Sequence, residues 1–180
     1  MRKKTMQELQ RKSVTEFRDA KKIPLIAVLD NVRSMHNVGS VFRTADAFLL
    51  TSVFLCGYTP VPPHREINKT ALGSTETVDW KYFPSTAEAL KHLNEEGYEI
   101  WAVEQVHDSI ILNEIEWQGN EKLAVIFGNE VSGVEDDILR LCKGSIEIPQ
   151  SGMKHSLNIS VAVGIVCWEF VRNLNGTETK

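Results

Sequence analysis

Residues 151–163 read Ser-Gly-Met-Lys-His-Ser-Leu-Asn-Ile-Ser-Val-Ala-Val, a polar loop that runs directly into an apolar segment. Two other junctions are of a similar kind: Asn37-Val-Gly-Ser-Val-Phe-Arg43 and Phe127-Gly-Asn-Glu-Val-Ser-Gly133. Each of the three follows an apolar run of strand length. Because α/β proteins bind ligands at the carboxyl ends of their strands, we expect the three junctions to converge on one edge of a sheet.

Short apolar runs alternate with segments of helical spacing along the chain. We expect strands at residues 25–29, 52–56, 77–83, 98–103, 122–127 and 145–148. We expect helices at 5–20, 38–49, 86–95, 135–142 and 157–172, and an irregular connection over the proline-containing residues 57–70. This alternation predicts a single α/β domain whose mainly parallel sheet is flanked by helices.

The composition, with 42% hydrophobic and 24% charged residues, is that of a globular domain. The isolated Cys56, Cys142 and Cys167 form no Cys-x-x-Cys pair, and the five histidines lack metal-ligand spacing, so no disulfide framework and no metal site are predicted. The apolar run 161–168 is too short to cross a membrane, and the charged N-terminus does not resemble a signal peptide. We therefore expect a cytoplasmic protein without a membrane partner.

Residues 1–22 carry a charge opposite to that of the rest of the chain. They hold eight Lys and Arg against three Asp and Glu, a net charge of +5, so that a chain of net charge −4 leaves −9 on the remainder. We expect a basic N-terminal helical arm over 1–22 that contacts phosphates, followed by a domain over 23–180. A solvated terminal helix without a ligand is the alternative interpretation.

The first junction places an Asn and an Arg at the start of a predicted helix. Asn37 is expected to cap this helix, whose free backbone N–H groups favour an anion. Since helical side chains lean toward the N-terminus, Arg43 is expected to reach back to the same anion, for which phosphate is the obvious choice. In the alternative, Asn37 only caps the helix and Arg43 pairs with Asp46 on its surface.

The other two junctions place polar side chains after buried strands. Glu130 lies in a glycine-bounded loop, where it either accepts hydrogen bonds from a ligand or only lies favourably near a helix N-terminus. This loop is neither a Gly-x-Gly-x-x-Gly fingerprint nor a P-loop. Ser156 is expected to cap the last helix, and no Gly-x-Ser-x-Gly elbow surrounds it, which argues against a serine hydrolase.

The last predicted helix is apolar on all sides. Between residues 159 and 171 only Ser160 and Glu169 are polar. Such a helix must be covered all round, and the sheet covers only one face. We therefore expect a homodimer through this C-terminal helix.

Together, the three junctions resemble the ordered motifs of the SpoU (TrmH-type) branch of the SPOUT RNA methyltransferases. The resemblance spans roughly residues 24–172 and is carried by Asn37-x-Gly-x-x-x-Arg43-Thr-Ala-Asp-Ala-Phe48, Phe127-Gly-Asn-Glu-x-x-Gly133 and Ile148-Pro-Gln-x-Gly-x-x-x-Ser156-Leu-Asn158. It implies methyl transfer from S-adenosylmethionine to a ribose 2′-hydroxyl of tRNA or rRNA. It also implies a homodimer and a C-terminal deep trefoil knot, which periodicity does not reveal.

The resemblance further implies roles for individual residues. It places the catalytic functions at Arg43, Asn37, Glu130, Ser156 and Asn158. It places the backbone that holds the cofactor at Phe127, Gly128, Ile148, Ser156 and Leu157, with Gly57 as a further candidate. Because arginine stays protonated in proteins, Arg43 is expected to bind a phosphate and orient the ribose rather than to act as a base.

Two other functions are compatible with the same fold. One is a non-catalytic RNA-binding module, against which the intact set of five catalytic-position residues argues. The other is a small-molecule α/β enzyme that uses a different nucleotide. Binding of S-adenosylmethionine separates the first alternative from the enzyme, and salt-sensitive binding to RNA separates the second.

Overall fold

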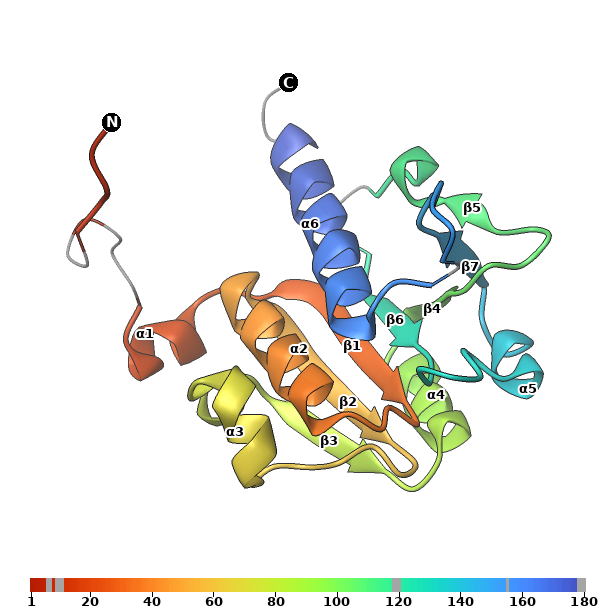
Figure 1. Cartoon of the computed structure of the whole chain (residues 1–180), viewed down its shortest axis with the longest axis horizontal. Coiled ribbons are helices and arrows are strands. Elements are labelled where there is room, and N and C mark those ends of the chain that lie inside the picture. The colour runs from red at the N-terminus through yellow and green to blue at the C-terminus, as the bar shows by residue number, and fades with distance from the viewer. Residues whose placement is uncertain (6–7, 9–11, 118–120, 155, 178–180) are drawn as a thin grey trace.

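The computed structural model describes residues 1–5, 8, 12–117, 121–154 and 156–177, with the side chains from 175 onward left out (Figure 1). Its strands are β1 (Ile23–Asp30), β2 (Leu50–Cys56), β3 (Trp80–Phe83), β4 (Glu99–Val103), β5 (Ile110–Ile111), β6 (Leu123–Phe127) and β7 (Gly144–Glu147). Its helices are α1 (Val14–Asp19), α2 (Met35–Ala47), α3 (Arg65–Ala71), α4 (Thr86–Glu95), α5 (Asp136–Leu139) and α6 (Ile159–Thr177), with 3₁₀ turns η1 (Ser74–Glu76) and η2 (Leu112–Glu114).

The described strands form one sheet in the order β3-β2-β1-β6-β4-β7-β5, and each neighbouring pair is parallel. The predicted α/β class with a mainly parallel sheet is therefore confirmed. β1 lies between β2 and β6 and is buried from Leu25 to Asp30, because helices cover both faces of the sheet here. The strand ends that precede the three junctions, those of β1, β6 and β7, point toward the same edge.

Helices cover the two faces of the sheet unequally. α2, α3 and α6 lie on one face, and α4 and α5 lie on the other (Figure 1). The larger core joins alternate residues of β1 to Val41 and Phe42 of α2 and to Val163 and Val166 of α6. The smaller core joins the opposite face of β1 to α4. Among the described residues, no helix has the length and apolar character that a membrane span requires.

The end of the basic N-terminal segment packs on the domain. α1 begins with a capping box, in which the side chains of Ser13 and Glu16 each accept a hydrogen bond from the other residue's backbone N–H. Phe17 is buried in the larger core, and Arg18 donates a hydrogen bond to the Glu76 carbonyl at 3.1 Å. The helix predicted over 5–20 is too long: it spans Val14–Asp19, because the N-cap Ser13 is extended and Thr5, Glu8 and Lys12 are not helical. Residues 6, 7 and 9–11 lie outside the described part of the chain.

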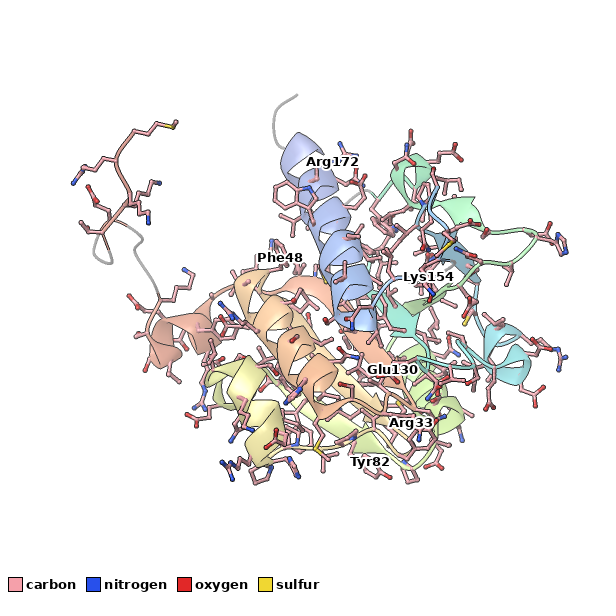
Figure 2. All side chains as sticks on the ribbon, in the orientation of Figure 1. Arg33, Phe48, Tyr82, Glu130, Lys154 and Arg172 are labelled. Atoms are coloured by element: carbon pink, nitrogen blue, oxygen red, sulfur yellow. The ribbon has the colours of Figure 1, made fainter. Side chains whose placement is uncertain are left out.

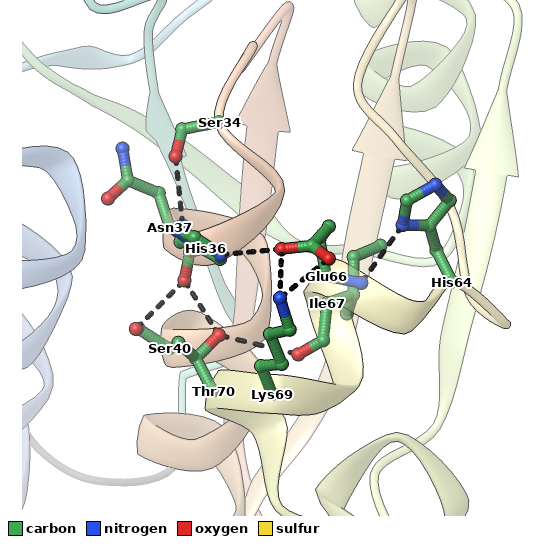
Figure 3. Close-up of polar contacts among 9 residues, drawn as sticks. All are labelled: Ser34, His36, Asn37, Ser40, His64, Glu66, Ile67, Lys69 and Thr70. Atoms are coloured by element: carbon green, nitrogen blue, oxygen red, sulfur yellow. Dashed lines mark hydrogen bonds and ion pairs between the residues drawn. The ribbon is translucent and has the colours of Figure 1, made fainter.

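A helix lies within the segment that we predicted to be irregular. α3 follows the prolines, and the His64 ring accepts a hydrogen bond from the Glu66 backbone N–H at its start. α3 packs closely on α2 at Gly39, which has no side chain to hold the helices apart. A Cβ at this position would collide with the Ile67 carbonyl and the Thr70 hydroxyl. Figure 3 shows this contact, in which Thr70 donates a hydrogen bond to the backbone of α2. We predicted an irregular segment from the prolines, but the last of them, Pro63, precedes the first residue of α3, so they do not interrupt the helix.

The predicted caps of α2 and α6 are wrong. Ser34 caps α2 and accepts a hydrogen bond from the Asn37 backbone N–H at 3.3 Å, so Asn37 lies inside the helix (Figure 3). Asn158 immediately precedes α6 and accepts a hydrogen bond from the Ser160 backbone N–H at 2.9 Å, a role we had given to Ser156. The Asn37 side chain is consequently available for contacts beyond its own helix.

Candidate active site

A chain of hydrogen bonds joins the three sequence junctions. The Asn37 side-chain amide donates to the Glu130 carboxylate at 3.1 Å. The Asn158 amide donates to the Asn37 side-chain oxygen at 3.1 Å. Asn37 lies in α2, Glu130 lies in the loop after β6, and Asn158 immediately precedes α6. The expected convergence of the three junctions on one edge of the sheet is therefore observed.

Glu130 occupies the anion-binding position that the sequence suggested for a phosphate. Its carboxylate accepts hydrogen bonds from the backbone N–H groups of Arg33 at 3.0 Å and Ser34 at 3.1 Å, just before α2. Partial burial raises the pKa of Glu130, but these bonds and the one from Asn37 outweigh it and hold the pKa below its ordinary value. The start of α2 is thus neutralised by the protein's own carboxylate.

A cavity of about 480 Å³ opens beside this cluster. It lies at the carboxyl ends of β4, β6 and β7 and extends to the start of α6. Its wall includes every residue at which we placed the cofactor: Phe127, Gly128, Ile148, Ser156 and Leu157. Glu130 and Asn158 line it as well, whereas Gly57 is absent from its described lining. This is the size and position expected of a ligand site in a parallel α/β sheet.

The charge of the cavity is acidic. Glu104, Glu130 and Glu147 line it, and none of its described lining residues is Lys, Arg or His. Glu104 accepts a hydrogen bond from the Val134 backbone N–H at 3.0 Å, and Glu147 accepts one from the Ser109 hydroxyl at 2.7 Å. The cavity therefore suits a ligand that carries positive charge, and it is poorly suited to a phosphate-rich cofactor.

Glu104 and Glu147 were missed by the sequence analysis. Glu104 is the first polar residue after the apolar run 98–103, and Glu147 alternates with Ile146 and Ile148 in the last strand. Both positions are compatible with any exposed strand end, so the sequence contains no specific signal for them. Only the neighbouring strands β4 and β7 bring the two carboxylates to one cavity.

The loop after β6 is closed on itself. Asn129 and Gly133 exchange backbone hydrogen bonds at 3.0 and 2.9 Å, and the Asn129 side-chain oxygen accepts one from the Val131 backbone at 2.8 Å. A Cβ at Gly128 would collide with the backbone of Gly133 and Val134. We expected Gly128 to allow close approach of a ligand; the structure shows that it first allows close approach of its own loop.

Arg43 lies away from this cluster. Its side chain is exposed and lines a second hollow of about 650 Å³ between α1, the second half of α2 and the segment from α3 to η1. Among the described residues no hydrogen bond or ion pair engages its guanidinium. Asp46, the partner in our alternative interpretation, accepts a hydrogen bond from the Thr77 hydroxyl at 2.7 Å instead.

Five side chains were assigned to catalysis, and the structure places them in two groups. Asn37, Glu130 and Asn158 form the hydrogen-bonded cluster, and Ser156 lies in the cavity wall. Arg43 is in the other hollow. Within the described ranges, no three His, Cys, Asp or Glu side chains are grouped so that they could hold a metal ion.

Comparison with curated proteins identifies relatives that cover almost the whole chain. A tRNA (guanosine(18)-2′-O)-methyltransferase of Thermus thermophilus is 32% identical over 172 residues, which are 96% of this chain and 86% of the relative. A 23S rRNA (guanosine-2′-O-)-methyltransferase RlmB of Vibrio vulnificus is 35% identical over 153 residues, which are 83% of this chain but only 59% of the relative.

Solved structures show the same likeness. The TrmH/SpoU tRNA modifying enzyme of Aquifex aeolicus superposes with a TM-score of 0.80 at 25% identity, covering 92% of this chain and 82% of the other. An AdoMet-bound rRNA methyltransferase of Sinorhizobium meliloti superposes with a TM-score of 0.79 at 27% identity, covering 88% and 60%. The model of the SpoU rRNA Methylase family matches residues 24–168. The resemblance drawn from the three motifs is confirmed, and the chain belongs to the SpoU rRNA Methylase family.

Proposed function

We propose that this protein transfers the methyl group of S-adenosylmethionine to a ribose 2′-hydroxyl of tRNA or rRNA. The observation that carries the proposal is the acidic cavity, whose wall holds residues of the second and third motifs and whose Glu130 and Asn158 are hydrogen-bonded to Asn37 of the first motif. The activities of the Thermus and Vibrio relatives support the reaction class, and the AdoMet-bound relative from Sinorhizobium supports the cofactor.

The residues of the cavity fit this cofactor. When bound, S-adenosylmethionine supplies an electrophilic methyl carbon on a positively charged sulfur. The apolar side chains of Ile148 and Leu157 and the backbone of Gly128 would hold its uncharged parts, and the surrounding carboxylates match its positive charge. An NAD or ATP site would require positive side chains or a glycine-rich phosphate loop, which the described wall lacks.

The hydrogen-bonded cluster would position the acceptor ribose. Asn37 lies between Glu130 and Asn158 and is 9% exposed, so its amide is held at a defined place beside the cavity. Glu130, whose lowered pKa keeps it ionised at neutral pH, fixes the orientation of that amide. Alignment of the 2′-oxygen by such preorganised groups contributes up to roughly 7–11 kcal/mol to catalysis.

Arg43 would complete the site from a second copy of the chain. The outer face of α6 leaves Val161, Ile165 and Trp168 exposed, with Trp168 at 57% and its ring 6.4 Å from that of Phe48. These residues are one or two turns apart and form an apolar stripe beside α2, in the area where Figure 2 labels Phe48. A homodimer through this stripe would bury it, and Arg43 of the partner subunit would reach the cavity and bind the phosphate beside the target ribose.

Two further expectations follow from family membership rather than from the described contacts. We infer that the segment 148–158, of which residue 155 lies outside the described part, carries the deep trefoil knot. We also place the protein in the cytoplasm, where tRNA and rRNA are modified.

Two measurements on the purified protein test the function. Isothermal titration with S-adenosylmethionine should give one site per chain, and incubation with tritiated S-adenosylmethionine and bacterial tRNA or rRNA should label the RNA. Nucleoside mass spectrometry should then identify a 2′-O-methylated ribonucleoside that RNA from a deletion strain lacks. Absence of cofactor binding would favour the non-catalytic RNA-binding module instead.

A further inference from the structure

Two tyrosines at the carboxyl end of the sheet have exposed rings and anchored hydroxyls. Tyr58 follows β2 and is 61% exposed, and Tyr82, near the end of β3, is 49% exposed. The Tyr82 hydroxyl donates a hydrogen bond to the Gly57 carbonyl at 3.0 Å, next to Tyr58 in the chain. An aromatic ring left exposed to water forgoes the favourable free energy of apolar burial, and neither tyrosine lines the cofactor cavity.

The Tyr58 ring is hydrogen-bonded to the loop after β6, which carries Glu130. Its hydroxyl accepts a hydrogen bond at 2.7 Å from the side-chain amide of Asn129, the residue before Glu130. The same amide donates to the Asn31 carbonyl at 2.7 Å, and the Tyr58 backbone N–H donates to the Asn31 side chain at 3.3 Å. Tyr58 is therefore held at both its ring end and its backbone, and its exposed face cannot move independently of the loop that carries Glu130.

The Arg33 side chain, which pairs with no described residue, lies beside the two tyrosine rings, which we call the tyrosine platform. The backbone of Val32 donates a hydrogen bond to the Thr59 hydroxyl at 3.0 Å, which joins the loop that contains Arg33 to the loop that contains Tyr58. The Arg33 side chain is exposed, and its guanidinium has no hydrogen bond or ion pair to any described residue. Figure 2 shows Arg33, Glu130 and Tyr82 at the end of the sheet toward which the strands point.

We propose that Tyr58, supported by Tyr82, stacks an unpaired nucleobase of the RNA substrate while Arg33 contacts an adjacent phosphate. Aromatic rings with free faces beside a basic side chain are the arrangement that recognises unpaired RNA. Stacking here would place the neighbouring nucleotide close to the Glu130–Asn37 cluster. This inference rests on the proposed RNA methyltransferase function and assigns part of its substrate recognition to a surface outside the motifs.

The test compares Tyr58→Ala with Tyr58→Phe in the full chain. Binding of a fluorescein-labelled unstructured RNA oligonucleotide and of bacterial tRNA is measured by anisotropy, and S-adenosylmethionine binding is measured by calorimetry. Loss of one stacked base predicts an affinity for RNA at least about fivefold weaker in Tyr58→Ala, with a matching rise in KM for RNA and an unchanged affinity for S-adenosylmethionine. Tyr58→Phe keeps the ring and should stay within about twofold of wild type.

Two controls separate stacking from general effects. Leu141→Ala removes another exposed apolar side chain, 50% exposed and outside both hollows, and should leave RNA affinity unchanged. In a plot of the logarithm of the RNA binding constant against the logarithm of the salt concentration, Arg33→Ala should make the slope less steep by about 0.7. Tyr58→Ala should leave this slope unchanged.

The outcomes are distinct. Wild-type RNA affinity in Tyr58→Ala would overturn the stacking platform, even if the enzyme methylates RNA normally. An equal loss in Tyr58→Phe, or a parallel loss of S-adenosylmethionine affinity, would also overturn it, because the hydroxyl anchor would then be responsible. If wild type neither binds S-adenosylmethionine nor methylates RNA while Tyr58→Ala still binds RNA more weakly, the proposed function fails and the platform stands.

Discussion

The cavity beside Glu130 and the hollow around Arg43 share no lining residue, although Glu130 accepts hydrogen bonds from the backbone just before α2 and Arg43 belongs to the same helix. The cavity is acidic, and its wall holds residues of the second and third motifs, whose Glu130 and Asn158 are hydrogen-bonded to Asn37 of the first motif within one chain. The hollow is lined by the basic residues Lys12 and Arg43 and by the acidic residues Asp46 and Glu76, and α1 closes one side of it. The difference indicates that a single chain builds the cavity proposed for the cofactor without bringing Arg43, the proposed catalytic arginine, to it.

The largest effect should come from Arg43→Ala. Removing the guanidinium should lower methyl transfer by about a hundred- to a thousandfold, because it removes the charge that orients the target phosphate. The affinity for S-adenosylmethionine should stay within about twofold, since Arg43 does not line the cavity. Turnover is measured by tritium transfer and cofactor binding by calorimetry. Turnover equal to wild type would remove Arg43 from the mechanism.

Gly128→Ala should damage the other half of the site. Its Cβ would collide with Gly133 and Val134, so the loop that forms the cavity wall must shift, and we expect S-adenosylmethionine to bind about tenfold more weakly or worse. Gly152→Ala is the matched control, because a Cβ there meets no heavy atom within 4 Å. Equal cofactor affinity in both variants, measured by calorimetry, would contradict the role of the closed loop.

Mixing these two variants tests whether the halves belong to different subunits. A dimer of one Arg43→Ala chain and one Gly128→Ala chain retains an intact cavity facing an intact Arg43 of the partner subunit. At a cofactor concentration too low to fill the Gly128→Ala cavity, both homodimers should transfer methyl groups much more slowly than wild type, and the mixture should be faster than either. If the arginine acts within its own chain, the mixture should stay as inactive as its components.

Trp168→Asp should separate the subunits. A carboxylate at position 168, in the exposed stripe of α6, would have to lose its hydration in an apolar contact, so we expect the dimer to dissociate at least about tenfold more readily. Leu141→Asp adds the same charge at another exposed apolar position and should leave the molar mass of the assembly equal to that of the wild-type dimer. Light scattering over a concentration series measures both. A wild-type protein that is monomeric at micromolar concentration would contradict the proposed dimer itself.

The smallest effect is the pH response of Glu130. Its folded-state pKa lies below the ordinary 4.5, so the ionised carboxylate stabilises the fold above that value and the contribution is lost as the pH falls toward the lowered pKa. Glu130→Gln should therefore be slightly less stable at pH 7, and its melting temperature should fall less on acidification. Thermal melts between pH 3 and 7 measure this. Parallel curves for the two proteins would indicate that the carboxylate is not stabilised by its backbone partners.

The strands were predictable because parallel, doubly covered strands are continuous apolar runs. The runs at 25–29 and 122–127 lie within or almost within β1 and β6, which pair directly. α3 was not predictable, because Pro60, Pro62 and Pro63 precede a short helix whose apolar signal is limited to Ile67 and Ala71. Helix propensity identifies the prolines as residues that interrupt a helix, but it does not indicate that a new helix begins shortly after them.

The candidate site was predictable in its membership and less so in its contacts. Asn37, Glu130 and Asn158 were selected because polar residues followed strands at the same edge. Their actual bonds differ from those expected: Ser34 took the capping role of Asn37, and Glu130 took the place of the phosphate at the start of α2. A cap shifted by three residues cannot be chosen from the sequence when Ser34 and Asn37 are both good capping residues.

By itself, the sequence determined the parallel α/β class, the three ordered motifs and the family, because apolar periodicity and local spacing are written along the chain. Only the tertiary structure decided that Glu104 and Glu147 join Glu130 in one acidic cavity, that Tyr58 is anchored by Asn129, and that Arg43 faces another hollow. These facts depend on which distant strand ends become neighbours and on which side of a helix a residue falls after packing. That information comes from the order of strands in the sheet, which spacing along the chain does not encode.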